Sequence, residues 1–271
     1  MPMTAEFTNG PVAFTSTYQV LVVEPPGLLG ALAIGQNHVI APMLMNADFS
    51  GAGGVMANTA VCRITAAATA TSVPCYFLPY LPNGATTMTI GGGAQYFFTS
   101  MMTGCTAQVF GPAATPTITH SNAAAAFNNA VGDLAAATLA GQNAINNMLP
   151  APPMGQIATS VSRLTMNNAY TPANMAAGRA AYPVLPNYHI KEVDATMVAT
   201  RGVNRPELGM FTFGFSTAGN WAFYAAVSTS VTGRQKKGHT WASPFGRMNF
   251  GVTNRALADG VVLGPSARFW P

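Results

Sequence analysis

Charged residues are scarce in this chain. Asp, Glu, Lys and Arg make up 7% of its 271 residues, whereas an average domain carries about 25%. The surface must therefore be built mainly from Thr, Ser, Asn, Gln, Gly and Ala, which is more typical of exported bacterial proteins and assembly proteins than of housekeeping enzymes. Clusters of Lys and Arg are also missing, so we expect no nucleic-acid partner.

Long apolar runs are missing as well. The best candidate, residues 27–42, is too short to span a bilayer and is interrupted by Gln36, Asn37 and His38. Residues 1–19 have neither a basic start nor a long apolar core, so we expect no Sec signal peptide. We therefore expect a soluble protein with no membrane partner, which would need a dedicated secretion machine if it is exported.

Motifs for metals and cofactors are absent from the sequence. It has no CxxC, no HExxH and no cluster of acidic residues, and the glycines at 91–93 lack the lysine of a phosphate-binding loop. We expect neither a metal nor an organic cofactor. The three cysteines are an odd count, so at least one lies outside any intrachain disulfide. Cys62 and Cys75 could bridge each other, or both could be core residues.

The few charges are unevenly distributed. Residues 1–150 contain one basic and four acidic side chains, a net charge of −3, whereas residues 151–271 contain eleven basic and four acidic ones, a net charge of +7. This asymmetry indicates a weakly basic docking face for a partner protein.

The hydrophobic patterning predicts many strands and few helices. Hydrophobic residues make up 49% of the chain, enough for a large core. We predict strands at 12–23, 55–65, 73–80, 86–90, 96–102, 105–110, 188–200, 210–217, 221–232 and after 252. We predict helices at 122–149, which Pro150 ends, and at 172–181. The expected fold is α+β, with two packed mixed β-sheets in a sandwich, surrounding helices and a single domain over residues 1–271, and we expect a monomer.

Two residues offer chemistry that the rest of the chain does not. Gly104 directly precedes Cys105, and a small residue before a thiol lets a substrate carbonyl approach the sulfur. His120 follows fifteen residues later and could take the thiol proton. Placed just before the predicted helix at 122–149, its ring would be kept neutral by the helix dipole. The alternative readings are a buried structural cysteine and a surface histidine.

The surrounding residues resemble a known active-site stretch. Phe97-Phe98-Thr99, Met102-Thr103-Gly104-Cys105, Val109-Phe110 and His120 are similar to the corresponding segment of Burkholderia lethal factor, in a family that includes the cytotoxic necrotizing factors and the chemoreceptor glutamine deamidases. About 25 residues carry the resemblance. Position 103 is Thr where the lethal factor has Ser, and the Cys-to-His spacing is closer to that of the necrotizing factors.

The resemblance implies a protein-glutamine deamidase with a cysteine nucleophile, acting as a bacterial toxin or effector. It implies catalytic roles for Cys105, His120 and Thr99, the last as the group that orients the imidazole. We expect the backbone N–H groups of Gly104 and Cys105 to hold the oxyanion, and Tyr80 and Arg234 to contact the substrate. By resemblance the partner is a target protein that carries the glutamine, such as a host translation factor or small GTPase, and the protein is secreted or translocated into a host cell.

Other readings stay open at this point. A transglutaminase or a cysteine protease would use the same thiol and imidazole. A secreted assembly or binding protein without enzymatic activity would also suit the low charge and the high content of Ala, Thr and Asn.

Overall fold

The computed structural model describes most of the N-terminal half and part of the C-terminal half of the chain. The described residues are 3–30, 32–51, 59–102, 105–123, 125–126, 134–162, 208–235, 242–243, 246–247, 255–263 and 266–271. The predicted helix at 172–181 and the predicted strand at 188–200 lie outside these residues, as does Gly104.

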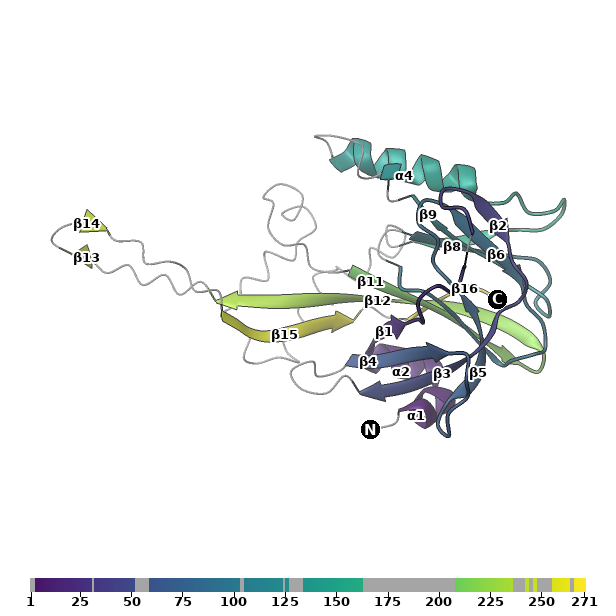
Figure 1. The fold of residues 1–271 in the computed structure, drawn as a ribbon, viewed down its shortest axis with the longest axis horizontal. Helices are drawn as coiled ribbons and strands as arrows, with labels where there is room; N and C mark the ends of the chain where they lie inside the picture. The colour runs from purple at the N-terminus through teal and green to yellow at the C-terminus, as the bar shows by residue number, and fades with distance from the viewer. Residues whose placement is uncertain are drawn as a thin grey trace.

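Two mixed β-sheets pack face to face, which confirms the expected α+β sandwich. Figure 1 shows the smaller sheet above the larger one. The larger sheet has nine strands in the order β1-β4-β3-β5-β7-β11-β12-β15, with β16 also paired to β12. The smaller sheet has five strands in the order β10-β8-β9-β6-β2. Each sheet contains at least one parallel pair, β1 with β4 and β5 with β7 in the larger sheet and β2 with β6 in the smaller one.

The bounds of the elements are as follows. The larger sheet consists of β1 (Gln19–Val23), β3 (Leu44–Gly51), β4 (Thr59–Thr65), β5 (Val73–Leu78), β7 (Tyr96–Thr99), β11 (Leu208–Thr217), β12 (Asn220–Gln235), β15 (Arg255–Leu263) and β16 (Ala267–Trp270). The smaller sheet consists of β2 (Asn37–Val39), β6 (Ala85–Thr89), β8 (Cys105–Phe110), β9 (Thr117–Asn122) and β10 (Thr159–Ser162). The helices are α1 (Thr4–Asn9), α2 (Pro11–Thr17) and α4 (Leu134–Met148), and β13 (Ala242–Ser243) pairs with β14 (Gly246–Arg247).

Alternation along β7 separates two cores. Successive strand residues point to opposite faces of a sheet, so Phe97 and Phe98 enter different clusters. Phe97 packs between the sheets with Trp221 and Phe223. Phe98 packs on the other face of the larger sheet, the face that α1 and α2 cover.

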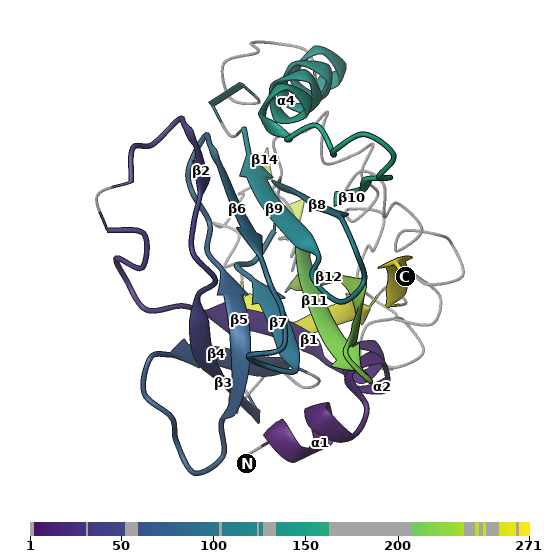
Figure 2. The same ribbon diagram turned by 90° about the vertical axis from the view of Figure 1, so that its right-hand side faces the viewer.

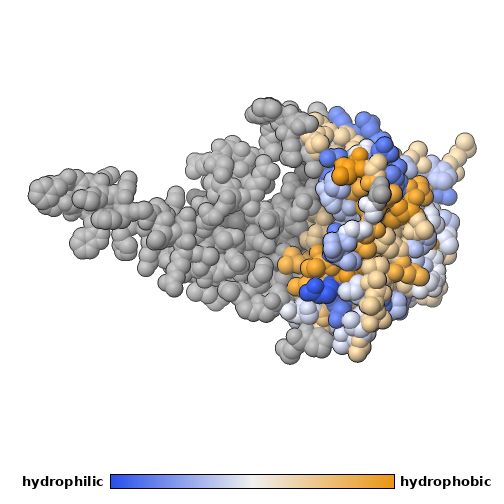
Figure 3. All heavy atoms as spheres, in the orientation of Figure 1, coloured by the Kyte–Doolittle hydropathy of each residue, from blue (hydrophilic) through white to orange (hydrophobic). Residues whose placement is uncertain are grey.

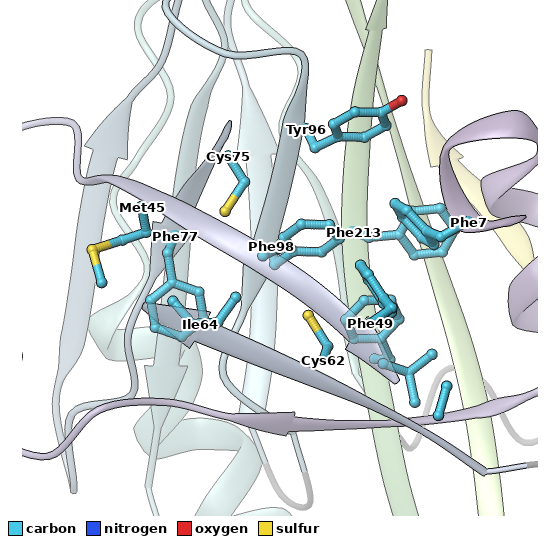
Figure 4. Close-up of a cluster of buried hydrophobic side chains, with 14 of the residues drawn as sticks. Phe7, Met45, Phe49, Cys62, Ile64, Cys75, Phe77, Tyr96, Phe98 and Phe213 are labelled. Carbon is cyan, nitrogen blue, oxygen red and sulfur yellow. The ribbon is translucent and has the colours of Figure 1, made fainter. Parts of the chain in front are cut away.

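The helix-side core is mostly aromatic. Phe7 of α1 stacks on Phe49 of β3 with 4.3 Å between ring centroids, and Phe98 and Phe213 surround the pair (Figure 4). Large aromatic side chains bury the most apolar area for each residue that is ordered. This core holds α1 and α2 against the sheet and leaves the opposite face free to pack on the smaller sheet.

Cys62 and Cys75 lie in the helix-side core and do not form a disulfide (Figure 4). Cys62 is on β4 and Cys75 on β5, and β3 runs between these two strands, so the sulfurs are not on adjacent strands. Bridging them would require the backbone to move. Burial raises the pKa of Cys62, and it raises the pKa of Cys75 to about 12. Both therefore act as apolar core residues.

The predicted strand at 12–23 is wrong in its first half and correct in its second half. Residues 11–17 form helix α2, and only Gln19–Val23 is a strand. Pro11 stands at the first turn, where a helix tolerates proline because the missing N–H would have no helical partner. Phe14 then packs edge-on against Phe7 and Phe49. This tertiary contact outweighs the β preference of the Val and Thr residues.

The predicted helix at 122–149 is confirmed over α4, Leu134–Met148, and is wrong at its start, because Asn122 is the last residue of strand β9. Residues 125 and 126 are helical, and residues 127–133 are not among those described. Figure 2 shows α4 beside the end of β9. His120 therefore lies inside a strand.

The strands predicted at 210–217 and 221–232 are confirmed, and they pair as the hairpin β11–β12. Thr217 pairs with Asn220 across a two-residue turn formed by Ala218 and Gly219. Both turn residues have positive φ, 51° and 83°, as the favoured two-residue hairpin turns require.

Some large apolar side chains reach the surface. Figure 3 shows hydrophobic and hydrophilic residues interspersed on the described part of the face in view. The exposed apolar side chains include Val39 on the edge strand β2, and Ile34, Leu44, Met154 and Ile157. None of the described helices is long and apolar enough to cross a membrane.

Candidate active site

Strands β8 and β9 bring Cys105 and His120 together. The two strands pair antiparallel, with Cys105 opposite Asn122 and Ala107 opposite His120. Residues two apart on a strand share a face, so Cys105 and His120 are diagonal neighbours on the same face of the smaller sheet. Gly111, with a φ of 101°, begins the connection between the strands.

The thiol lies in an apolar layer between the sheets. Cys105 is 2% exposed and packs with Met102, Ala107, Met210 and Ala225. Met102 and Met210 are joined by a backbone bridge that fixes the segment before β8 to β11 of the larger sheet. The nucleophile predicted from the sequence is thus held by both sheets.

Asn122 is a polar neighbour of the sulfur. Its Nδ2 donates to Cys105 Sγ at 3.2 Å. Its Oδ1 accepts from the backbone N–H of Asn83 at 3.2 Å and from the Tyr80 hydroxyl at 3.4 Å. Because a backbone N–H can only donate, the atom facing Asn83 must be the oxygen, and the NH₂ group must face the thiol.

Burial makes His120 a neutral side chain at pH 7. The ring is 1% exposed, and burial lowers its pKa to about 4, while a backbone contact with Leu78 opposes this change. Neither ring nitrogen has a partner of good hydrogen-bond geometry among the described residues, so we treat the Leu78 contact as weak. The expectation that a helix dipole keeps the ring neutral is wrong, because His120 lies in β9. Desolvation has that effect instead.

Tyr80 is the half-buried side chain beside the pair. Its ring centroid lies 6.1 Å from that of His120. Burial raises the pKa of Tyr80, and the nearby Cys105 raises it further. Of the two residues expected to contact substrate, Tyr80 is therefore placed at the thiol and the imidazole.

The segment that carries Tyr80 is anchored at several points. The Tyr80 N–H donates to Ser100 Oγ at 2.7 Å, and Ser100 Oγ donates to Glu24 Oε2 at 2.6 Å. Thr86 Oγ1 donates to the Pro79 carbonyl at 2.9 Å. At Gly84 a Cβ atom would collide with a neighbouring carbonyl oxygen, so only glycine fits there. The backbone of this segment is thus fixed, while the Tyr80 side chain is partly exposed.

Thr99 lies in the larger sheet, on β7. It pairs with Leu78, whose backbone is the one in contact with His120. The Thr99 hydroxyl is buried and donates to the Ser100 carbonyl at 2.9 Å, so the hydroxyl is not the group that orients the imidazole. A catalytic role for Thr99 through its backbone stays a prediction.

The remaining predicted residues lie outside the site or outside the described chain. Gly104 is not described, so the predicted oxyanion contribution of its N–H stays a prediction, as does that of Cys105. Arg234 is on β12, opposite Ala256. It lies nine residues beyond Ala225, which packs against Cys105, and at about 3.3 Å per residue this is roughly 30 Å of strand. Arg234 does not belong to the group around the thiol, and a role in docking a target stays a prediction.

The structure adds residues that the sequence analysis missed. The sequence prediction places Asn122 at the start of the helix at 122–149, whereas in the structure it is the last residue of β9. Reading 117–122 as a strand would have put Asn122 on the same face as His120. No local signal could have found Leu78, because it reaches the imidazole from the other sheet.

The arrangement of these side chains suits thiol chemistry. In the described part of the chain, no group of three or more His, Cys, Asp or Glu side chains could hold a metal ion. A thiol, a neutral imidazole and an amide donor face one region between the sheets. No family model and no curated protein matches this chain. Function must therefore be argued from these side chains and from the resemblance of residues 97–120.

Proposed function

We propose that this protein hydrolyses the side-chain amide of a glutamine in a target protein, with Cys105 as nucleophile and His120 as proton carrier. One observation carries the proposal: a thiol and a buried neutral imidazole are diagonal neighbours on one face of β8 and β9. A neutral imidazole can accept the thiol proton, whereas an imidazolium cannot.

The reaction has two halves. His120 takes the proton of Cys105, and the thiolate adds to the γ-carbon of the glutamine side chain. The tetrahedral adduct collapses, the C–N bond breaks, and ammonia leaves with the proton that His120 returns. Water then attacks the thioester, again with His120 as base, and glutamate is released from the sulfur. The product carries one negative charge more than the substrate.

Burial limits how the pair can ionise. An isolated imidazolium at His120 would be costly, since desolvation lowers its pKa to about 4. A thiolate and an imidazolium that form together attract each other and offset part of that cost. The Asn122 amide that donates to the sulfur also favours the thiolate. The closed site therefore rests as the neutral pair and ionises in step with the attack.

Substrate access requires movement of Tyr80. Cys105 and His120 are almost fully buried, whereas Tyr80 beside them is partly exposed. A glutamine side chain that displaces the Tyr80 ring reaches the thiol without any break in the β8–β9 pair. In this proposal Tyr80 acts as a cover that the target protein moves aside.

The biological setting in this proposal comes from the resemblance of residues 97–120. The protein is a secreted toxin or effector of the glutamine deamidase type that acts on a host protein, such as a translation factor or a small GTPase. It works as a monomer and needs no cofactor. A change from glutamine to glutamate in a functional loop would be enough to disable such a target.

A second candidate function rests on the burial of the thiol. Cys105 lies among methionines and alanines and is 2% exposed, as is common for a cysteine that only packs. The protein would then be a structural or binding protein, for which the low charge and the high content of small polar residues are suitable.

Mass spectrometry in isotopic water separates these functions. Candidate host proteins are incubated with the protein in H₂¹⁸O, and ammonia release and intact mass are measured. Deamidation incorporates one heavy oxygen at a glutamine, proteolysis cleaves the chain, and transglutamination adds an amine. The proposal requires ammonia release that Cys105→Ser abolishes while its circular dichroism matches that of the wild type. An equal signal from Cys105→Ser would overturn it.

A further inference from the structure

We infer that the side-chain amide of Asn122 supplies an oxyanion-hole donor for the attack by Cys105. This inference rests on the proposed function and extends it, because the oxyanion donors expected from the sequence are backbone N–H groups. The stabilised group is the negatively charged oxygen of a tetrahedral adduct formed on the sulfur.

The position of the amide fits this role. Nδ2 of Asn122 lies 3.2 Å from Cys105 Sγ. When the thiolate adds to a carbonyl, the new S–C bond forms, the C=O π pair moves onto oxygen, and that oxygen is attached to the carbon next to the sulfur. A donor already at the sulfur therefore lies close to the position where the oxyanion forms. When the adduct collapses, the C=O bond re-forms and ammonia leaves with the proton from His120.

Other hydrogen bonds of Asn122 hold its side-chain amide in place. Its Oδ1 accepts from the backbone N–H of Asn83, a bond that does not depend on the position of the Tyr80 ring, and the Asn122 N–H donates to the Gly84 carbonyl at 2.9 Å. Asn83, which has a positive φ of 54°, is itself fixed because its Oδ1 accepts from the Ala125 N–H at 2.6 Å. A donor that is fixed before the reaction stabilises developing charge without a cost of reorganisation.

The choice of residue also points to chemistry. Asn122 is 6% exposed and faces a sulfur, which is a weak acceptor. An amide aimed at the thiol is useful where a stronger acceptor, an oxyanion, forms beside that sulfur.

Two small electrophiles test the inference without a target protein. p-Nitrophenyl acetate acylates a thiolate through a tetrahedral oxyanion, and iodoacetamide alkylates it with no oxyanion. Both reactions consume the same thiolate, so the ratio of their rate constants at Cys105 cancels any change in thiolate population or access. The ratio is measured by peptide mapping in the wild type, Asn122→Ala and Asn122→Asp. The matched control is Asn46→Ala, which removes an amide that donates to the Ala66 carbonyl on the larger sheet.

We expect both Asn122 variants to lower the acylation-to-alkylation ratio by about 100-fold, the effect of removing one oxyanion donor, with no change in Asn46→Ala. Asn122→Asp keeps the side-chain volume and the oxygen that accepts from the Asn83 N–H. It therefore tests the inference even if Asn122→Ala does not fold. An unchanged ratio in the Asn122 variants would overturn the inference and leave the proposed function standing. If wild-type Cys105 reacts with neither reagent faster than Cys62 and Cys75, both the proposed function and this inference are wrong.

Discussion

Cys105 and His120 are diagonal neighbours across β8 and β9, fixed by the pairing of Cys105 with Asn122 and of Ala107 with His120. A backbone ladder, and not a loop, therefore sets the separation of thiol and imidazole. Such a pair stays in place when neighbouring segments move. In the proposed mechanism, the part that must move is the Tyr80 side chain.

The first prediction concerns the order in which the cysteines react. Cys105 should be alkylated by iodoacetamide before Cys62 and Cys75 near neutral pH. Those two are fully buried, and burial raises the pKa of both, to about 12 for Cys75, so neither supplies thiolate. Peptide mapping after limited alkylation of the native protein measures this. Equal labelling of the three sites, or earlier labelling of another cysteine, would contradict the assignment of Cys105.

The second prediction is a pH dependence of stability that depends on His120. Its pKa in the folded state is about 4, below the usual 6.5. Between these values the unfolded chain binds the proton and the folded protein does not, so the free energy of unfolding should rise with pH over this window and level off above it. A shift of this size corresponds to about 3 kcal/mol. Urea titrations from pH 4 to pH 8 measure the slope.

His120→Leu should flatten that slope and raise stability at low pH, because it removes a buried ring whose nitrogens lack good partners among the described residues. Glu24 has the opposite effect on this slope. Burial raises the pKa of its carboxyl, so above pH 4.5 the folded state binds this proton more tightly than the unfolded chain does. Glu24→Gln is therefore the matched control, and its slope should be steeper than that of the wild type. If stability depends on pH as steeply in His120→Leu as in the wild type, the His120 ring is not a buried neutral imidazole in the folded protein.

Local signals in the sequence were enough for several elements. The strand expected at 105–110 has those bounds in the structure, because Pro112 and the glycine before it end the strand. The break expected between the strands at 210–217 and 221–232 is also where the turn lies, because Gly219 adopts positive φ readily. These features depend on neighbours in the chain, which a sequence shows directly.

Other features depend on residues far apart in the chain. Helix α2 forms where Phe14 can pack on Phe7 and Phe49, and no local pattern shows that contact. The neutral state of His120 was expected, but for a wrong reason, because the end of β9 was taken for the start of a helix. The approach of Leu78 and Tyr80 to the imidazole follows from sheet packing, which strand patterns alone do not define.

The third prediction separates the two possible contributions of Thr99. Thr99→Val should keep ammonia release within a few-fold of wild type, because the hydroxyl donates to the Ser100 carbonyl and not to the imidazole. It should cost about 1 kcal/mol of stability for the lost buried hydrogen bond. Initial rates and urea unfolding measure both effects. A loss of rate as large as that of Cys105→Ser, with little loss of stability, would instead assign the hydroxyl a catalytic role.

The fourth prediction concerns Tyr80 as the cover of the site. Tyr80→Ala should speed alkylation of Cys105 by iodoacetamide about 10-fold or more, because it removes a partly exposed ring beside a thiol that is 2% exposed. Tyr80→Phe keeps the ring and loses only the 3.4 Å hydrogen bond to Asn122, so its alkylation rate should stay within about 3-fold of the wild type, as expected for a weak bond. Labelling of Cys62 and Cys75 is the internal measure of global unfolding and should not change in either variant. If all three cysteines are labelled faster in Tyr80→Ala, the substitution acts by lowering stability. If Cys105 is labelled as slowly as in the wild type, the substrate must reach the thiol from another side.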